Sequence, residues 1–274
     1  MSVHCQTVSL IKSEEAGSQQ LEQQVAILIP AYNEAQHLEA LIERTMEIEP
    51  AFVVIIDDAS TDRSAEVLQK LQARYGEAGN ARLHVLNNEQ NLGKQGSIRC
   101  GLRYLRDHDV CVDVVALIDG DGQHDPAELP ALCGLLRYYD VVLGARCQQE
   151  MPLHRRFSNG LVNVGYALIG GVDFVDVQSG LRIYSWAHAM LLAEELPEEG
   201  GYSIEHESLA ILARHAQAQR EELRIAAATI SCAYGPASSM TPRDLWELAV
   251  QTVRQAFRVR RYQRPLPAAW EVSS

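Results

Sequence analysis

Short apolar runs alternate with amphipathic stretches along the first half of the chain. The apolar runs predict strands at 25–29, 52–56, 83–86, 114–118 and 141–143. The stretches between them have helical periodicity near 34–48, 62–75, 94–106 and 126–138. Continuous apolar strands that alternate with helices are typical of a parallel sheet covered on both faces. The predicted fold class is therefore α/β.

The pattern is looser after residue 150. It predicts helices near 153–170, 185–195, 205–216 and 242–261, and strands near 172–177 and 223–230. Two helix starts are marked by capping residues, Asp62 for one and Asp125 with Pro126 for the other. We expect one α/β domain with a less regular second half.

The predicted domain covers 24–240, with a nucleotide-binding half at about 24–146 and an acceptor half at about 147–240. Residues 1–23 are polar, rich in Gln, Glu and Ser, and without periodicity, which predicts a flexible tail. Residues 241–274 are expected to form a basic amphipathic helix and a terminal tail.

Composition narrows the function classes. The chain has 24 Lys and Arg against 36 Asp and Glu, a formal net charge of -12, which argues against nucleic acid as a partner. None of the 6 cysteines form a CxxC pair, so we expect free thiols rather than a zinc cluster. Neither a signal peptide nor a spanning apolar segment is evident, and we expect a cytoplasmic protein.

Polar clusters follow four of the predicted strands. Their sequences are PAYNE at 30–34, DDASTD at 57–62, NNEQNLGK at 87–94 and DGDGQHD at 119–125. In a parallel sheet, ligands bind at the carboxyl ends of the strands, near the point where the strand order reverses. The four clusters therefore predict one site assembled from separate loops.

The fourth cluster carries the clearest chemistry. Asp119 and Asp121 flank a glycine directly after a strand, so both carboxylates can converge on one hard divalent cation. Asp and Gly also favour ordinary turns. Gln123 supplies a further oxygen ligand and Pro126 a helix start, which favours a functional site. Such a cation could bridge diphosphate oxygens and neutralise a leaving group.

These motifs, in this order and spacing, resemble inverting glycosyltransferases of the family-2 type with a GT-A fold. The nearest resemblance is to the branch of dolichyl-phosphate mannosyltransferase and polyprenyl-phosphate glycosyltransferases. The motifs of the first half are IPAYNE, IDDASTD, NLGKQGS and DGDGQHDP. Those of the second half are GAR at 144–146, MPLHRRFSN at 151–159, DVQSGLRIYS at 176–185, SIEHE at 203–207 and YGPASSMTPRD at 234–244. Gly120 departs from the usual alanine of that family, and we expect it to loosen the loop.

The resemblance implies a role for each matching residue. The residues implied in donor binding are Pro30, Tyr32, Glu34, Ile56, Asp58, Lys94, Asp119 and Gly120. Those implied in holding Mg or Mn ions are Asp119, Asp121 and Gln123. Lys94 is expected to reach the diphosphate or the ribose, with a solvated lysine at a helix start as the alternative.

The second half is expected to bind the acceptor. The residues implied in catalysis are Asp121, Arg146, Arg182 and Glu207, and those in acceptor binding are Arg156, Gln178 and Ser179. Arginine suits phosphate through its forked donors, although surface arginines on helices would give the same pattern. A hydroxyl acceptor requires a general base, for which Asp121, Glu205 and Glu207 are candidates, whereas an ionised phosphate can attack unaided.

Residues 254–264 contain five arginines, no acid and three interleaved hydrophobic residues. Such a segment can lie on an anionic membrane surface, here the inner face of the membrane. It can equally pack on its own acidic domain or on a partner subunit.

Together the residues and the resemblance predict a metal-dependent enzyme that moves a sugar from a UDP- or GDP-sugar donor to a polyprenyl phosphate. A hydroxyl of a glycan, protein or small molecule is the alternative acceptor. A scaffold that binds a nucleotide sugar without turnover is the alternative of another class. A dinucleotide-dependent dehydrogenase is disfavoured because no GxGxxG follows the first strand.

Overall fold

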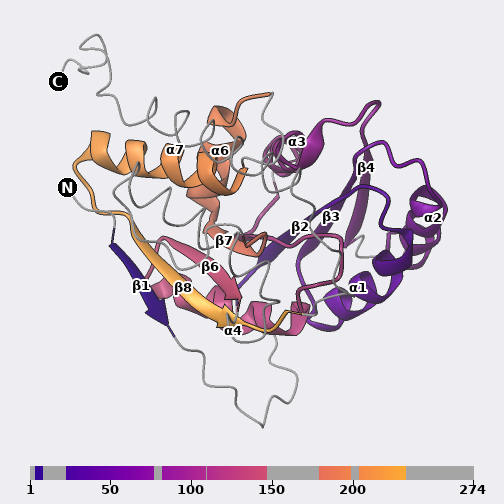
Figure 1. The fold of residues 1–274 in the computed structure, drawn as a ribbon, viewed down its shortest axis with the longest axis horizontal. Coiled ribbons are helices and arrows are strands. Elements are labelled where there is room, and N and C mark those ends of the chain that lie inside the picture. Colours follow the sequence, from indigo (N-terminus) through magenta and orange to yellow (C-terminus); the bar gives the residue numbers. More distant parts are fainter. Residues whose placement is uncertain are drawn as a thin grey trace, which may run out of the picture.

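The computed structural model describes residues 4–8, 23–76, 82–108, 110–146, 179–198 and 204–232. Within them, eight strands form one sheet in the order β1-β8-β6-β7-β5-β2-β3-β4. The strands are β1 (His4–Val8), β2 (Val25–Ala31), β3 (Phe52–Asp57), β4 (Leu83–Asn87), β5 (Val114–Leu117), β6 (Val141–Arg146), β7 (Arg182–Ser185) and β8 (Arg224–Ile230). Figure 1 places β1, β6 and β8 toward one side of the molecule and β2 to β4 toward the other.

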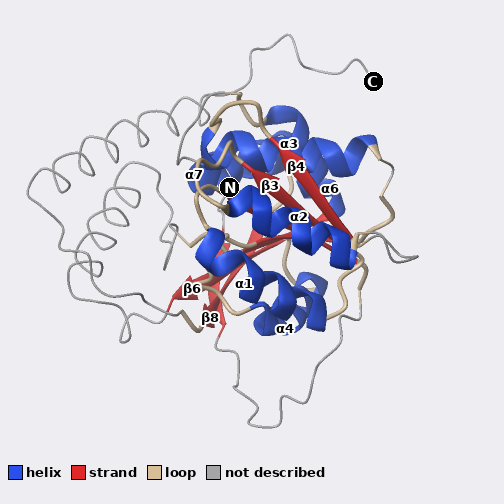
Figure 2. Ribbon diagram, turned by 90° about the vertical axis from the view of Figure 1, so that its right-hand side faces the viewer, coloured by secondary structure: helices blue, strands red, loops and turns tan. Residues whose placement is uncertain are grey.

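Helices cover both faces of the sheet, as the alternation of strands and helices predicts. The helices are α1 (Ala35–Glu47), α2 (Ser64–Tyr75), α3 (Gly93–Asp107), α4 (Leu129–Gly134), α6 (Trp186–Glu195) and α7 (Ile204–Gln219). Val25, Ile27 and Ile29 of β2 share a buried cluster with α1, α2 and α4, whereas Ala26 and Leu28 share another with α3, α6 and α7. Figure 2 shows α3, α6 and α7 on one side of the strands and α1 and α4 on the other.

One strand runs against the others. β7 is antiparallel to both of its neighbours, β5 and β6, while the remaining pairs are parallel. β7 is absent from the predicted strands, because four residues that include a buried Arg182 do not make a continuous apolar run. Through β7, the two halves of the chain share one sheet.

The fourth predicted helix, 126–138, is divided into three short pieces. A 3-10 turn at Pro126–Glu128 precedes α4, and a second 3-10 turn at Leu135–Arg137 follows it. Pro130 lies in the first turn of α4 and has no N–H to continue the turn that Pro126 opens. The predicted start at Asp125 is confirmed, since its side chain accepts a hydrogen bond from the N–H of Ala127.

The N-terminal segment departs from the expected tail. His4–Val8 pair in parallel with β8 as an edge strand, so the prediction of a tail over all of 1–23 is wrong for these five residues. Their polar composition hides the strand, because an edge strand needs no continuous apolar run. The elements predicted at 153–170, 172–177 and 242–261 lie outside the described residues. Within the described ranges, no helix has the length and hydropathy needed to cross a membrane.

Candidate active site

The strand order reverses at β2. The chain passes from β2 outward through β3 to β4, and then returns to place β5 on the other side of β2. The carboxyl ends of β2 and β5 therefore flank the crevice where ligands bind in open α/β sheets. Two predicted clusters, residues 30–34 and 119–125, begin at this point.

Gly120 lets the loop after β5 lie against the end of β2. A methyl group added at this buried glycine would be 2.9 Å from the carbonyl oxygen of Pro30. The close approach requires glycine, so the residue that departs from the family pattern packs the loop tightly rather than loosening it.

The two aspartates of this loop have different partners. The Asp119 carboxylate forms an ion pair with Lys94, with 2.7 Å between Oδ1 and Nζ. It also lies against Gly180, where an added methyl group would overlap it. Asp121 accepts a hydrogen bond of 3.0 Å from the backbone N–H of Gln123. This bond fixes the turn between Asp121 and Gln123, which are both predicted metal ligands.

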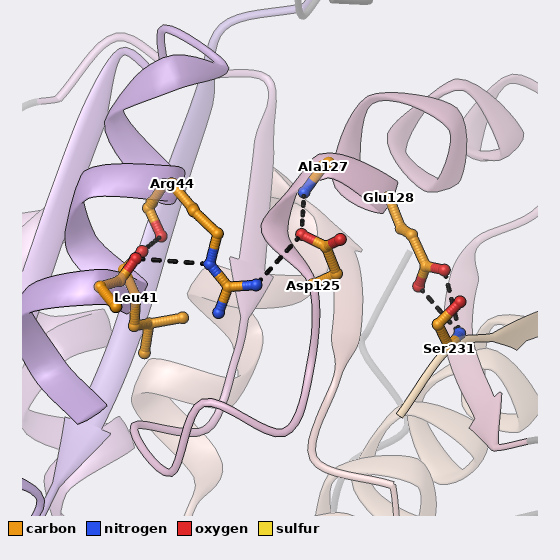
Figure 3. Close-up of polar contacts among 8 residues, drawn as sticks. Leu41, Arg44, Asp125, Ala127, Glu128 and Ser231 are labelled. Atoms are coloured by element: carbon orange, nitrogen blue, oxygen red, sulfur yellow. Dashed lines mark hydrogen bonds and ion pairs between the residues drawn. The ribbon is translucent and has the colours of Figure 1, made fainter. Parts of the chain in front are cut away.

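The far end of the loop is tied to α1 and β8, as Figure 3 shows. Asp125 Oδ1 lies 3.7 Å from the Arg44 guanidinium of α1. The Glu128 carboxylate accepts hydrogen bonds of 2.9 and 3.3 Å from the N–H of Ser231, just after β8. These contacts anchor the far end of the loop that carries Asp119 and Asp121.

The loops after β2 and β3 are joined by Asn33. Its Oδ1 accepts hydrogen bonds of 2.8 Å from the N–H of Thr61 and 3.2 Å from the N–H of Asp62. Asp62 in turn accepts from the N–H groups of Ala35 and Ser64, the first residues of α1 and α2. The predicted capping role of Asp62 thus extends to two helices.

Glu34 is half-buried between this pair of loops and the loop after β5. Burial raises the pKa of its carboxyl group, and the charges of Asp121, Asp62 and Asp119 raise it further, while His37 partly opposes them. The site therefore concentrates negative charge and favours a cation.

The other predicted donor residues occupy contrasting positions. Tyr32 is 45% exposed beside the end of β2, and Pro30 is partly buried. Asp58 is buried, and its Oδ1 accepts hydrogen bonds of 2.8 Å from both Asn88 Nδ2 and the N–H of Leu92. Ile56 is fully buried under α3, so its side chain offers no surface to a donor, and its implied role in donor binding stays a prediction.

Lys94 lies at the start of α3, in the crevice rather than in solvent. Its ammonium contacts Asp119 and also Glu205 at the start of α7, at 2.7 and 2.6 Å. Burial disfavours its charge, but the attraction of the two carboxylates outweighs this and raises the pKa of Lys94. The lysine is therefore a fixed positive charge beside the predicted metal ligands.

The second half contributes a buried polar group behind these residues. Arg182 is 1% exposed and donates to the carbonyl oxygen of Ser179 at 3.2 Å and to Ser208 Oγ at 3.3 Å. Glu207 is also buried, on α7. These contacts link β7 to α7 and indicate that Arg182 positions the site from within the core.

Some predicted residues are not placed. Arg156 and Gln178 lie outside the described residues, and of Arg146 only the backbone, at the end of β6, is described. Asn33 and Asn88 have no predicted role, although both stand in the polar clusters after strands. The packing of the Asp119 carboxylate against Gly180 has no signal in the sequence.

The residues after β5 fit a hard divalent cation. Asp119, Asp121 and Gln123 offer carboxylate and amide oxygens, which Mg2+ and Mn2+ prefer. Among the described residues, no group of three or more His, Cys, Asp or Glu is arranged to hold a metal ion. Ligands from a bound diphosphate or from water would complete such a site.

Comparison with known sequences supports the resemblance to glycosyltransferases. The sequence model of "Glycosyl transferase family 2" matches residues 26–174. A relative from Pseudomonas aeruginosa (strain LESB58), an undecaprenyl-phosphate 4-deoxy-4-formamido-L-arabinose transferase, is 36% identical over 179 residues. That match covers 62% of this chain and 50% of the relative, so the chain spans about half the length of this curated relative.

Solved structures confirm the predicted GT-A fold. Glucosyl-3-phosphoglycerate synthase from Mycobacterium tuberculosis, in complex with Mn2+, UDP and its product, has a TM-score of 0.60 at 18% identity, over 87% of this chain and 80% of that one. A mannosyltransferase from Pyrobaculum calidifontis with GDP-Man and Mn2+ has a TM-score of 0.60 at 17% identity, over 89% and 66% of the two chains. With its fold and more than half of its length matched, the chain belongs to glycosyl transferase family 2.

Proposed function

We propose that the protein transfers a sugar from a UDP- or GDP-sugar to a polyprenyl phosphate, with inversion at the anomeric carbon and with Mg2+ or Mn2+ as cofactor. The observation that carries this proposal is the convergence of Glu34, Asp119 and Asp121 at the point where the strand order reverses. The donor classes agree with the UDP and GDP-Man complexes of the structural neighbours, and the acceptor agrees with the names of the relatives.

The first half would bind the donor. The exposed ring of Tyr32 offers a stacking surface at the rim, and Asp58, which already holds the loop before α3, would accept from a ring N–H of the base. Asp119, Asp121 and Gln123 would hold the cation, which neutralises charge on the departing diphosphate. Lys94 adds a second positive charge for the diphosphate.

The second half would bind the acceptor. An oxygen of the acceptor phosphate attacks the anomeric carbon, and the bond from that carbon to the diphosphate oxygen breaks, so the nucleotide diphosphate leaves with the electron pair. Because a phosphate monoester is largely ionised at neutral pH, this step needs no general base. Arg146, Arg156, Gln178 and Ser179 would hold the acceptor, and the buried Arg182 and Glu207 would position the site from β7 and α7.

Thermal shift measurements test the donor and the metal together. UDP, GDP and their common sugar conjugates are added with and without Mn2+. We expect a rise in Tm that requires the metal and is lost in Asp121→Ala. Failure of every nucleotide to shift the folded protein would contradict the proposed donor site.

Transfer assays with the donor so identified test the acceptor. Undecaprenyl phosphate is compared with the corresponding alcohol and with small hydroxyl acceptors, including phosphoglyceric acid. Product formed only with the lipid phosphate supports the proposal, and product formed only with a hydroxyl replaces it with the alternative acceptor. Donor binding without transfer or hydrolysis would instead favour a scaffold.

We also propose that the protein attaches peripherally to the inner face of the membrane through residues 254–264, which lie outside the described residues. Five arginines without an acid favour an anionic lipid surface. Flotation with anionic and neutral vesicles, on the intact chain and on one ending near residue 250, tests this attachment. Absence of binding to anionic vesicles would exclude it.

A further inference from the structure

Three elements that are distant in the sequence meet at one ammonium group. Lys94 at the start of α3 contacts Asp119 after β5 and Glu205 at the start of α7. The exposed fractions of the three side chains are 17%, 25% and 9%, so water screens these contacts little. Helices α3 and α7 cover the same face of the sheet, which allows a residue of the second half to reach the predicted metal loop.

The position of Asp119 beside the lysine is confined on one side. Its carboxylate is packed against Gly180, where even a methyl group would overlap it. A divalent cation that uses Asp119 must therefore compete with the ammonium for the same carboxylate. Glu205 gives the ammonium a second partner of equal charge, so Lys94 can release Asp119 without leaving the site.

On the basis of the proposed function, we propose that the ammonium of Lys94 is a resident cation, which pairs with Asp119 when no metal is bound. Glu205 is the positioning residue that retains Lys94 when a metal replaces the ammonium at Asp119. The ammonium then remains beside the metal as a second positive charge for the donor diphosphate. Metal affinity in this protein is thus set partly by a carboxylate of α7 that does not itself hold the ion.

A double-mutant cycle on Mn2+ binding tests this proposal. Free Mn2+ is measured by electron paramagnetic resonance without nucleotide for the wild type, Lys94→Met, Glu205→Gln and the double variant. We expect Lys94→Met to tighten binding roughly tenfold, because it removes the competitor. When Lys94 is present, Glu205→Gln should weaken Mn2+ binding several-fold, because the ammonium then has only Asp119 as a charged partner. In the Lys94→Met background, the same substitution should weaken Mn2+ binding clearly less.

A metal-free readout accompanies the cycle. In EDTA, Lys94→Met should lower the Tm, because Asp119 and Glu205 lose the cation between them. Lys94→Gln, which keeps a hydrogen-bond donor, is carried through the same cycle in case Lys94→Met does not fold.

The Arg99–Glu198 ion pair provides a matched control. It also joins α3 to the second half, at 3.0 Å, but does not reach Asp119. Glu198→Gln removes one negative charge and should leave Mn2+ affinity unchanged. Equal effects of Glu205→Gln with and without Lys94, or an unchanged affinity in Lys94→Met, would overturn the resident-cation proposal alone. Mn2+ binding that is absent, or unaffected by Asp121→Ala, in both the wild type and Lys94→Met would overturn the proposed metal site as well.

Discussion

The ionised carboxylate of Glu34, a residue of the candidate site, destabilises the folded state. Burial and the neighbouring Asp121, Asp62 and Asp119 raise its pKa, and a carboxyl group whose pKa is raised by folding destabilises the fold once it is ionised. We expect Glu34→Gln to raise the Tm of the metal-free protein by about 1 to 2 °C at pH 7. The gain should shrink as the pH falls through the raised folded pKa and should vanish below about 4, where the carboxyl group becomes protonated in both states.

Thermal melts in EDTA across this pH range measure the effect. Glu39→Gln, at an exposed position of the same helix, is the control and should change the Tm little at any pH. An equal shift at all pH values would contradict the electrostatic origin. Glu34→Gln should also weaken Mn2+ binding, since it removes part of the negative charge that favours the ion.

Gly180 sets the position of a predicted metal ligand. A methyl group at this residue would overlap the Asp119 carboxylate, so Gly180→Ala must displace Asp119. We expect the variant to fold but to lose most of the Tm rise caused by UDP or GDP with Mn2+. Gly134→Ala is the matched control, because nothing lies within 4 Å of the added methyl group there. A full ligand-induced shift in Gly180→Ala would show that the position of Asp119 is not critical.

Between elements, Asp140 fixes the start of β8 beside β6. Its carboxylate accepts hydrogen bonds of 2.8, 3.3 and 3.0 Å from the N–H, Nε and Nη2 of Arg224. Burial acts against ionisation, but these bonds outweigh it and lower the pKa of Asp140. The stabilisation is therefore present above the unfolded pKa of about 4 and is lost as the pH falls through the lower folded value.

We expect Asp140→Asn to lower the free energy of unfolding by about 1 kcal/mol at pH 7, a modest figure because Arg224 is largely exposed. The difference from the wild type should narrow below pH 4 in urea titrations. Asp107→Asn, which removes an exposed pair with the adjacent Arg106, should have little effect. Similar losses in both variants would contradict a specific role for Asp140.

For the molecule as a whole, β7 makes the two halves one folding unit. Ile183 is fully buried in β7 and pairs with Ala116 of β5 and Val142 of β6. Ile183→Ala should cost about 2 to 5 kcal/mol and should lower the stability of both halves together. Hydrogen exchange measured by mass spectrometry should show peptides from β2 and from β8 losing protection in parallel.

Ile183→Val, which removes one methylene group, should show the same parallel loss at about 0.5 to 1.5 kcal/mol. Loss of protection confined to β6, β7 and β8 would show instead that this side of the sheet unfolds separately from β2 to β5.

The amino-acid sequence by itself determined the central strands, most helices and the place of the site. Buried parallel strands need continuous apolar runs, and strands β2 to β6 overlap the predicted runs. Because strand ends meet at one edge of the sheet, the polar clusters around Asn33, Asp58, Lys94 and Asp119 predict one site. Their local spacing was sufficient for that inference.

Only the tertiary structure decided which of these residues act on one another. The Lys94–Glu205 contact joins residues 111 positions apart, and the close packing of the Asp119 carboxylate against Gly180 depends on β7 lying beside β5. The burial of Ile56, an apolar residue near a strand end, likewise depends on how α3 packs on the sheet. A sequence pattern indicates burial and turns within its own segment. Contacts between residues of different strands and helices follow from how distant segments pack.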